Sequence, residues 1–184
     1  MLLSIVTVVL NCVDTIERTI RSIIEQDCNN VEYIIIDGGS IDGTLDIIKK
    51  YEEKISYCIS EPDNGIYYAM NKGINVSTGN WIAFMNGNDW YEPNIFDNIL
   101  EILGNSTYDI VYGKVNKIEN GQKKGYLGMC EEGDPEILHA GNLYCHQGLF
   151  IRKKLFDTLG LYDCKYKILA DYDWILRAHT QGIN

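Results

Sequence analysis

The chain has 184 residues, 46% of them hydrophobic, which predicts one globular domain with a sizeable core. A net charge of −10 argues against nucleic acid as the main partner, because nucleic-acid recognition needs a basic surface. The same charge means that an anionic substrate would need a bridging cation. The six cysteines form no Cys-x-x-Cys pair, which disfavours structural zinc and is typical of reduced thiols in a cytoplasmic protein.

Strands and helices are predicted to alternate through the first 107 residues. Apolar runs typical of buried strands occupy residues 4–10, 31–36, 55–59 and 80–85. The first run is too short to span a membrane and no basic leader precedes it, so a strand is expected and not a signal peptide. Helical spacing predicts helices after Asp14, near 45–51, over 66–74 and from a first turn that contains Pro93. This alternation favours a parallel sheet covered by helices.

The pattern changes after residue 107. Residues 108–118 and 122–127 are predicted to be strands joined at Asn120–Gly121, a strong hairpin signal. A strand is expected over 148–151, then a helix over 153–159 and a last helix that starts near Asp171. With no linker between the two parts, residues 1–184 are expected to form a single domain.

Polar loops follow the four predicted parallel strands, at residues 11–14, 37–43, 61–65 and 86–90. The carboxyl ends of parallel strands meet at one edge of the sheet, where such folds bind ligands. Each loop alone is explained equally well as a turn, and Asp42 as a helix cap. The loop at 37–43 is not Gly-x-Gly-x-x-Gly, so a dinucleotide cofactor is disfavoured. Convergence of four such loops nevertheless predicts a binding site.

Two acidic positions stand out. Asp89 ends the run that starts at Trp81, where it could hold a divalent cation or cap the next helix. Asp171 and Asp173 open the last helix, where a carboxylate could act as a general base or simply complement the helix dipole. His146 could orient a substrate or a pyrophosphate, but a lone histidine is more often structural.

Taken in order, these stretches resemble the family 2 inverting glycosyltransferases with the GT-A fold, especially the bacterial branch that builds capsule, O-antigen or exopolysaccharide. The resemblance covers nearly the whole chain. The matching segments are 4–11 (SIVTVVLN), 32–40 (EYIIIDGGS), 42–44 (DGT), 60–66 (SEPDNGI), 69–73 (AMNKG), 79–89 (GNWIAFMNGND), 146–152 (HQGLFIR) and 170–174 (ADYDW).

The resemblance implies a mainly parallel, Rossmann-like α/β sheet with a mixed second half. Residues 1–107 would bind a nucleotide-diphosphate sugar, with UDP expected, and 108–184 would supply the acceptor side and the base. Mn²⁺ or Mg²⁺ would be held by Asp89, and Asp171 would be the catalytic base. The nucleotide pocket would be lined by Thr7, Asn11, Asp37, Asp63 and Asn88, with Asp37 contacting the base.

The sequence also departs from the family pattern. Asn86 and Asn88 replace acids, Tyr68 stands where an aspartate is usual, and Ala170 replaces a glutamate. The chain ends soon after its last helix, so part of the acceptor region is expected to be absent. The acceptor would be a glycan or a lipid-linked glycan, and contact with the inner membrane face and pairing of two copies stay open.

Two alternative functions share features with this sequence. A nucleotidyltransferase needs a glycine-rich, basic N-terminal loop for its triphosphate, and residues 8–12 supply none. A non-catalytic module that only binds the sugar donor is the alternative that remains, because of the missing acids.

Overall fold

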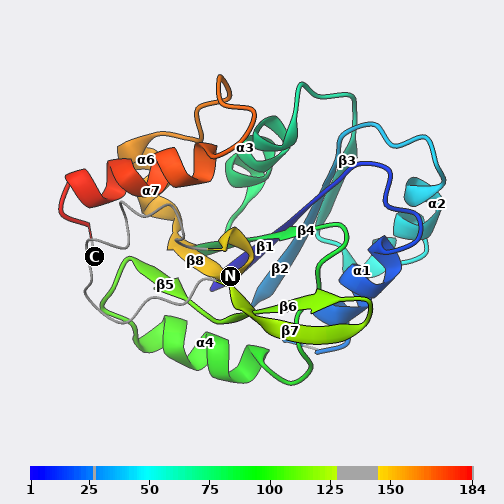
Figure 1. The fold of residues 1–184 in the computed structure, drawn as a ribbon. Coiled ribbons are helices and arrows are strands. Elements are labelled where there is room, and N and C mark those ends of the chain that lie inside the picture. The colour runs from blue at the N-terminus through cyan, green and yellow to red at the C-terminus, as the bar shows by residue number, and fades with distance from the viewer. Residues whose placement is uncertain (27, 128–144, 184) are drawn as a thin grey trace.

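The computed structural model describes residues 1–26, 28–127 and 145–183, in which the main feature is a six-stranded sheet of order β3-β2-β1-β4-β8-β5 (Figure 1). Strands β1 to β4 are parallel, and β8 is antiparallel to both β4 and β5. The mainly parallel α/β sheet with a mixed second half is therefore confirmed. The strands are β1 Leu3–Val9, β2 Val31–Asp37, β3 Tyr57–Ser60, β4 Trp81–Asn86, β5 Ile110–Tyr112, β6 Val115–Glu119, β7 Gln122–Leu127 and β8 Leu149–Arg152.

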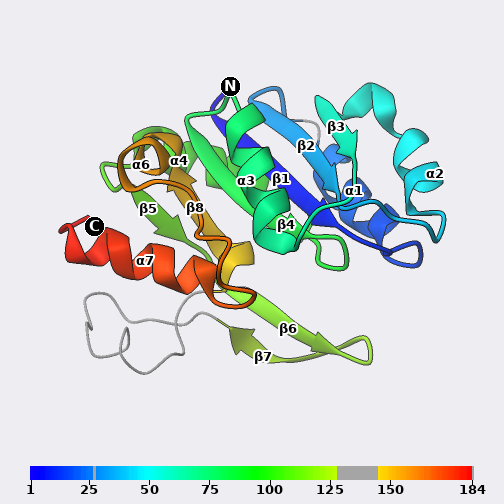
Figure 2. The same ribbon diagram turned by 90° about the horizontal axis from the view of Figure 1, so that it is seen from above.

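Helices cover both faces of this sheet (Figures 1 and 2). Helices α3, α6 and α7 lie on one face, and α1, α2 and α4 lie on the other. The helices are α1 Ile16–Ile24, α2 Thr44–Lys49, α3 Ile66–Val76, α4 Phe96–Asn105, α6 Lys153–Leu159 and α7 Ala170–Thr180, with short 3₁₀ turns η1 Glu52–Lys54 and η2 His146–Gly148. Within the described ranges, no helix is long and apolar enough to cross a membrane.

The two faces bury separate hydrophobic clusters because successive side chains of a strand point to opposite sides. In β1, Val6 and Val8 pack under α3, whereas Ile5 and Val9 pack toward α1 and α4. Helix α3 lies so close to β1 that a Cβ at Gly73 would overlap the Val6 side chain. This double coverage explains why the central strands are continuously apolar.

The hairpin predicted at Asn120–Gly121 is confirmed. Both residues have positive φ values, 52° and 73°, as the tightest hairpin turns require. The strand predicted over 108–118 is wrong, however, because it breaks at Gly113–Lys114 into β5, which joins the main sheet, and β6, which pairs with β7. Gly113 N–H donates to Gly148 O at 2.8 Å, so contact with η2 ends β5.

Helix α4 begins later than predicted. Pro93 lies in the preceding turn, and the helix starts at Phe96. The backbone N–H groups of Ile95 and Phe96 both donate to the Gln26 side-chain oxygen, at 2.9 and 3.3 Å. A residue 69 positions away thus caps the helix start, which local sequence rules cannot detect.

Candidate active site

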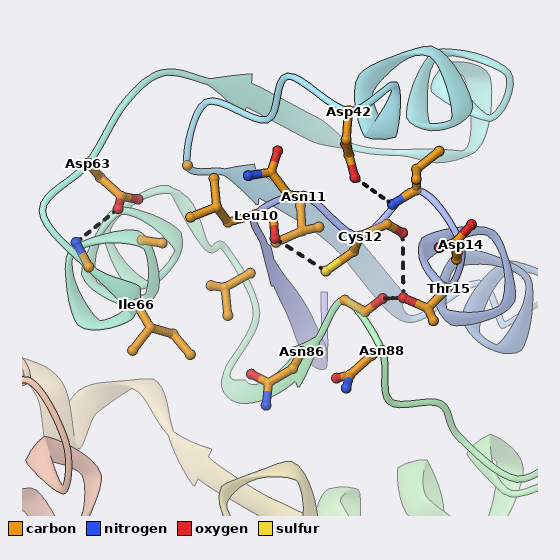
Figure 3. A pocket seen from close by; sticks show the side chains of 17 residues that line it. Leu10, Asn11, Cys12, Asp14, Thr15, Asp42, Asp63, Ile66, Asn86 and Asn88 are labelled. Carbon is orange, nitrogen blue, oxygen red and sulfur yellow. Dashed lines mark hydrogen bonds between the residues drawn. The ribbon is translucent and has the colours of Figure 1, made fainter. Parts of the chain in front are cut away.

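A cavity of about 550 Å³ opens at the carboxyl ends of β1, β2 and β4 (Figure 3). The strand order reverses between β1 and β4, which is where open α/β sheets bind ligands. All four predicted polar loops contribute to the lining, so their convergence is confirmed. The labelled lining residues are Leu10, Asn11, Cys12, Asp14, Thr15, Asp42, Asp63, Ile66, Asn86 and Asn88.

Asn11 joins the first two loops at the wall of this cavity. Its backbone N–H donates to Ser40 Oγ at 2.8 Å, and its side-chain oxygen accepts from Ile41 N–H at 3.0 Å. Asn11 has φ of 51°, a left-handed conformation that asparagine tolerates better than most residues. Asp42 links the same loops by accepting from Val13 N–H and from Thr44 N–H, both at 3.0 Å. These contacts make the cavity wall a fixed structure.

Thr7 and Asp37, both expected in the nucleotide pocket, are not among the residues that line this cavity. Thr7 is fully buried and hydrogen-bonds Tyr33 Oη at 3.1 Å. Asp37 is also fully buried. Its carboxylate accepts hydrogen bonds from Gly39 N–H, from Ser40 N–H and Oγ, and from Ser60 Oγ. These hydrogen bonds fold the 38–40 turn, so in this structure Asp37 supports the cavity wall.

Asp63, in contrast, lines the cavity as predicted and keeps one oxygen unused. Oδ1 accepts from Gly65 N–H at 3.0 Å, whereas Oδ2 is buried without a hydrogen-bond partner. Oδ2 lies so close to Gly38 that an added Cβ there would be 3.4 Å away. A buried carboxylate oxygen without a donor is costly, so Asp63 is well suited to accept a hydrogen bond from a ligand.

The loop after β4 is hydrogen-bonded to residues at the start of α1. Thr15 Oγ1 donates to Gly87 O at 2.9 Å, and Thr19 Oγ1 donates to Asp89 O at 2.7 Å. Arg18 stacks over Trp90, with its guanidinium carbon 3.5 Å from the ring centroid. These contacts fix the backbone, which leaves the side chain of Asn88 exposed at the cavity.

Asp89 is half-buried, and its Oδ2 accepts from Gln147 Nε2 at 2.8 Å. No cluster of three or more His, Cys, Asp or Glu side chains that could hold a metal occurs within residues 1–26, 28–127 and 145–183. Asp89 is therefore a single carboxylate beside the neutral amides of Asn86 and Asn88. That donor set fits a hard divalent cation that takes its other ligands from a bound diphosphate and water. It does not fit a site built wholly from protein ligands.

Asp171 lies in the first turn of α7, but it does not cap the helix, because the N-cap is Leu169 and no side-chain cap bond forms. The Asp171 side chain is only 20% exposed. Oδ1 accepts from Tyr67 Oη at 2.8 Å, and Oδ2 lies 3.3 Å from His146 Nδ1. Burial alone would raise the pKa of Asp171, yet the hydrogen bonds from His146 and Tyr67 lower it below the ordinary carboxyl value. Asp171 is therefore an ionised, partly buried carboxylate.

Asp173 has a different environment. Its carboxylate pairs with Arg177 Nε at 3.1 Å, one helical turn away, and Arg177 also donates to the carbonyl of Leu161 at 2.9 Å. Asp173 thus anchors α7 to the preceding loop. Of the two acids at the start of α7, Asp171 is the one that fits a general base.

His146 connects the base to the β4 loop. Its Nε2 lies 3.3 Å from Asn86 Oδ1, on the opposite side of the ring from Asp171. The sequence pattern singles out His146 but not Tyr67, the second hydrogen-bond partner of Asp171, which is the second residue of α3 and carries no motif of its own. Gln147, which contacts Asp89, was missed as well.

A second cavity of about 460 Å³ adjoins the first. Thr15 and Asn88 line both, and Asp89 and Gln147 line the second. Thr15 and Asn88 therefore lie at the boundary of the two cavities, and the next residue, Asp89, faces the second.

The fold is the GT-A fold. A structure of *S*. *aureus* TarS 1-349 in complex with UDP matches with a TM-score of 0.77 at 19% identity, over 95% of this chain and 54% of that one. Mannosyltransferase PcManGT from Pyrobaculum calidifontis, in complex with GDP-Man and Mn²⁺, matches with a TM-score of 0.71 at 16% identity, over 98% and 53%. The chain thus spans about half the length of these solved structures.

Sequence comparison identifies the family. Residues 4–160 match the model for glycosyl transferase family 2, and the chain belongs to that family. A PGL/p-HBAD biosynthesis glycosyltransferase of Mycobacterium bovis is 32% identical in an alignment 183 positions long that covers 96% of this chain and 69% of that protein. The putative teichuronic acid biosynthesis glycosyltransferase TuaG of Bacillus subtilis is 29% identical over 144 residues, 76% of this chain and 53% of TuaG.

Proposed function

We propose that this chain transfers a sugar from a nucleotide-diphosphate donor, with UDP as the expected nucleotide, to a hydroxyl of a glycan or lipid-linked acceptor in cell-surface polysaccharide synthesis. The observation that carries the proposal is the ionised Asp171 carboxylate, held beside the end of β4 through His146. Relatives named for PGL/p-HBAD and teichuronic acid biosynthesis support the assignment.

The donor would lie in the first cavity, which has the size typical of small-molecule sites. The nucleobase would meet Asp63, whose carboxylate lines the cavity and would accept from a ring N–H such as that of uracil. The diphosphate would then lie along the loop of Asn86 to Asp89, toward the second cavity. Structures of the same fold in complex with UDP and with GDP-Man support a nucleotide-linked donor.

The proposed cation is Mn²⁺ or Mg²⁺, held by Asp89 and the diphosphate. A bound divalent cation would stabilise the negative charge of the departing diphosphate. Asp89 would supply one carboxylate, and Gln147 would keep that carboxylate oriented.

The proposed reaction is a single displacement with inversion at the anomeric carbon. Asp171 takes the proton of the acceptor hydroxyl while the oxygen of that hydroxyl forms a bond to the anomeric carbon. The bond from that carbon to the diphosphate oxygen breaks, and its electron pair leaves with the nucleoside diphosphate. Asp171 is suited to the role because its lowered pKa keeps it unprotonated at neutral pH.

The loop before α7 supports a lipid-linked acceptor. Residues 165–169 (KYKIL) are all exposed, with Ile168 76% and Leu169 59% exposed, directly before the buried Ala170 and the base. Exposed aliphatic side chains beside lysines match the chemistry of a membrane surface with anionic headgroups. Membrane contact at this loop would bring a lipid-linked acceptor to Asp171.

A non-catalytic donor-binding module is the second candidate, favoured by the neutral Asn86 and Asn88 in the cation loop. A thermal-shift screen of nucleoside diphosphates with and without Mn²⁺ tests donor binding for both candidates. The enzyme proposal predicts that UDP stabilises the fold and that Mn²⁺ enlarges the shift in the wild type but not in Asp89→Ala. A ligand at 100 times its Kd adds about 2.7 kcal/mol to the stability. Equal shifts with and without metal would contradict the proposal that Asp89 binds a cation. Hydrolysis of a UDP-sugar would distinguish the enzyme from the non-catalytic donor-binding module.

A further inference from the structure

Two consecutive side chains of η2 reach the two carboxylates of the candidate site. His146 contacts Asp171 on α7, and Gln147 contacts Asp89 after β4. Asp89 and Asp171 are 82 positions apart in the sequence and lie on different elements. The 3₁₀ turn is therefore a direct structural connection between the proposed donor side and the proposed base.

The imidazole of His146 uses both of its nitrogens. A carboxylate can only accept, so Nδ1 carries the proton in the 3.3 Å contact with Asp171 Oδ2. With the proton on Nδ1, the neutral ring accepts at Nε2, so the Asn86 side-chain amide, 3.3 Å away, would face it with its NH₂ group. The His146 side chain is 20% exposed, so little water competes for these contacts. One ring thus fixes the orientation of Asp171 relative to the end of β4.

The turn that carries these side chains is itself held in place. Gly148 N–H donates to Cys145 O, and Gly148 O accepts from Gly113 N–H, both at 2.8 Å. A Cβ at Gly148 would lie 2.5 Å from Gly113 O and 2.9 Å from Val115 Cγ2, so the backbones are in close contact there. A turn packed this tightly against β5 and β6 is a rigid support for two side chains.

We propose that His146 and Gln147 are positioning residues with separate tasks. His146 holds Asp171 in the orientation that accepts the proton, and Gln147 holds Asp89 in the orientation that binds the cation and diphosphate. This inference rests on the proposed function and deepens it, because it divides support of the site between two neighbouring side chains.

Three variants of His146 test whether it holds Asp171, because they differ in where they place a hydrogen-bond donor. An asparagine amide can replace the Nδ1 position of histidine, whereas a glutamine amide reaches the Nε2 position. His146→Asn should therefore keep the contact with Asp171 and retain most of kcat for UDP-sugar hydrolysis. His146→Gln and His146→Ala should lose about 10- to 100-fold in kcat, the usual loss when a supporting hydrogen bond is removed. The Kd for UDP should stay within about twofold in all three variants, because hydrogen bonds from Thr15 and Thr19 still hold the backbone of the loop that His146 contacts through Asn86.

Gln147→Ala should show the opposite pattern. The Kd for UDP measured by calorimetry should rise about 10-fold in the presence of Mn²⁺ and stay near the wild-type value without metal. His146→Ala should leave this metal effect intact. The exposed His179, on the last turn of α7, gives a matched control, because His179→Ala should change neither quantity.

The outcomes separate this inference from the proposed function. Absence of both UDP binding and turnover in the wild type would overturn the proposed function itself. A wild-type enzyme whose kcat is unaffected by His146→Ala, or falls equally in His146→Asn and His146→Gln, would overturn the assignment of His146. Loss of the metal effect in His146→Ala as well as Gln147→Ala would show that the turn acts only as a common scaffold.

Discussion

Replacement of Asp171 by asparagine is expected to abolish sugar transfer and leave nucleotide binding almost unchanged. Asparagine has the same shape, and its oxygen can still accept from Tyr67, but it cannot take a proton from an acceptor hydroxyl. The residues proposed to contact the nucleotide lie on the loops after β1, β3 and β4, away from α7, so the donor cavity should stay intact.

The magnitude follows from the contacts of Asp171. Loss of a general base lowers the rate by about 10² to 10⁴-fold. The variant also loses the charge-assisted contact with His146, which is worth about 1.5 to 3 kcal/mol for a hydrogen bond to a charged group. At about 2 to 4 °C per kcal/mol for a chain of this size, the melting temperature should fall by roughly 3 to 12 °C.

Asp173→Asn is the matched control for this assay, because it makes the same chemical change two residues along the same helix. Its carboxylate pairs with Arg177, so the variant should lose some stability and keep the wild-type kcat. UDP-sugar turnover, UDP affinity and melting temperature should be measured for both variants. Turnover retained in Asp171→Asn and lost in Asp173→Asn would refute the assignment of the base.

Three further predictions concern other parts of the chain. Asp63→Asn should weaken UDP binding at least about 10-fold with little change in stability, whereas Asp37→Asn should mainly lower stability; the reverse pattern would restore Asp37 as the base-contacting residue. Burial opposes ionisation of Glu32, but hydrogen bonds from Ser4 and Thr78 lower its pKa below the usual value. The stability that Glu32 contributes is thus present above its unfolded pKa and is lost as pH falls through its lower folded pKa. Urea unfolding between pH 7 and pH 3 should accordingly show a smaller acid loss in Glu32→Gln, and an unchanged loss would contradict this. Ile168→Ser should reduce co-sedimentation with anionic vesicles. Equal binding by the wild type and the variant would contradict membrane contact through the 165–169 loop.

The sheet could be predicted from the sequence because its signals are local. Four apolar runs, each followed by a polar loop, are sufficient to predict parallel strands whose loops converge on one edge. The break of the 108–118 strand could not be predicted, because it depends on the contact of Gly113 with Gly148, 35 positions away. The late start of α4 has the same kind of cause in its contact with Gln26.

The site was predicted in part. Asn11, Asp63 and Asn88 line the first cavity, Asp89 lines the second, and Asp171 is joined to this region through His146 of η2. An aspartate at the end of a strand gives the same sequence signal whether it faces a ligand or stabilises its own loop. In this structure Asp37 stabilises its loop, because it accepts hydrogen bonds from the 39–40 turn and from Ser60. The hydrogen bond from Tyr67 to Asp171 could not be predicted from the sequence, because it joins α3 to α7 across 104 positions.

Proton NMR of the sugar released from a UDP-α-sugar tests the central claim most directly. Water can replace the acceptor, so the assay needs only the chain, Mn²⁺ and a panel of UDP-sugars. A single displacement assisted by Asp171 predicts that the β-anomer of the free sugar appears first and then mutarotates. First release of the α-anomer would contradict the single displacement, and UDP binding without any release would contradict catalysis in favour of a donor-binding module.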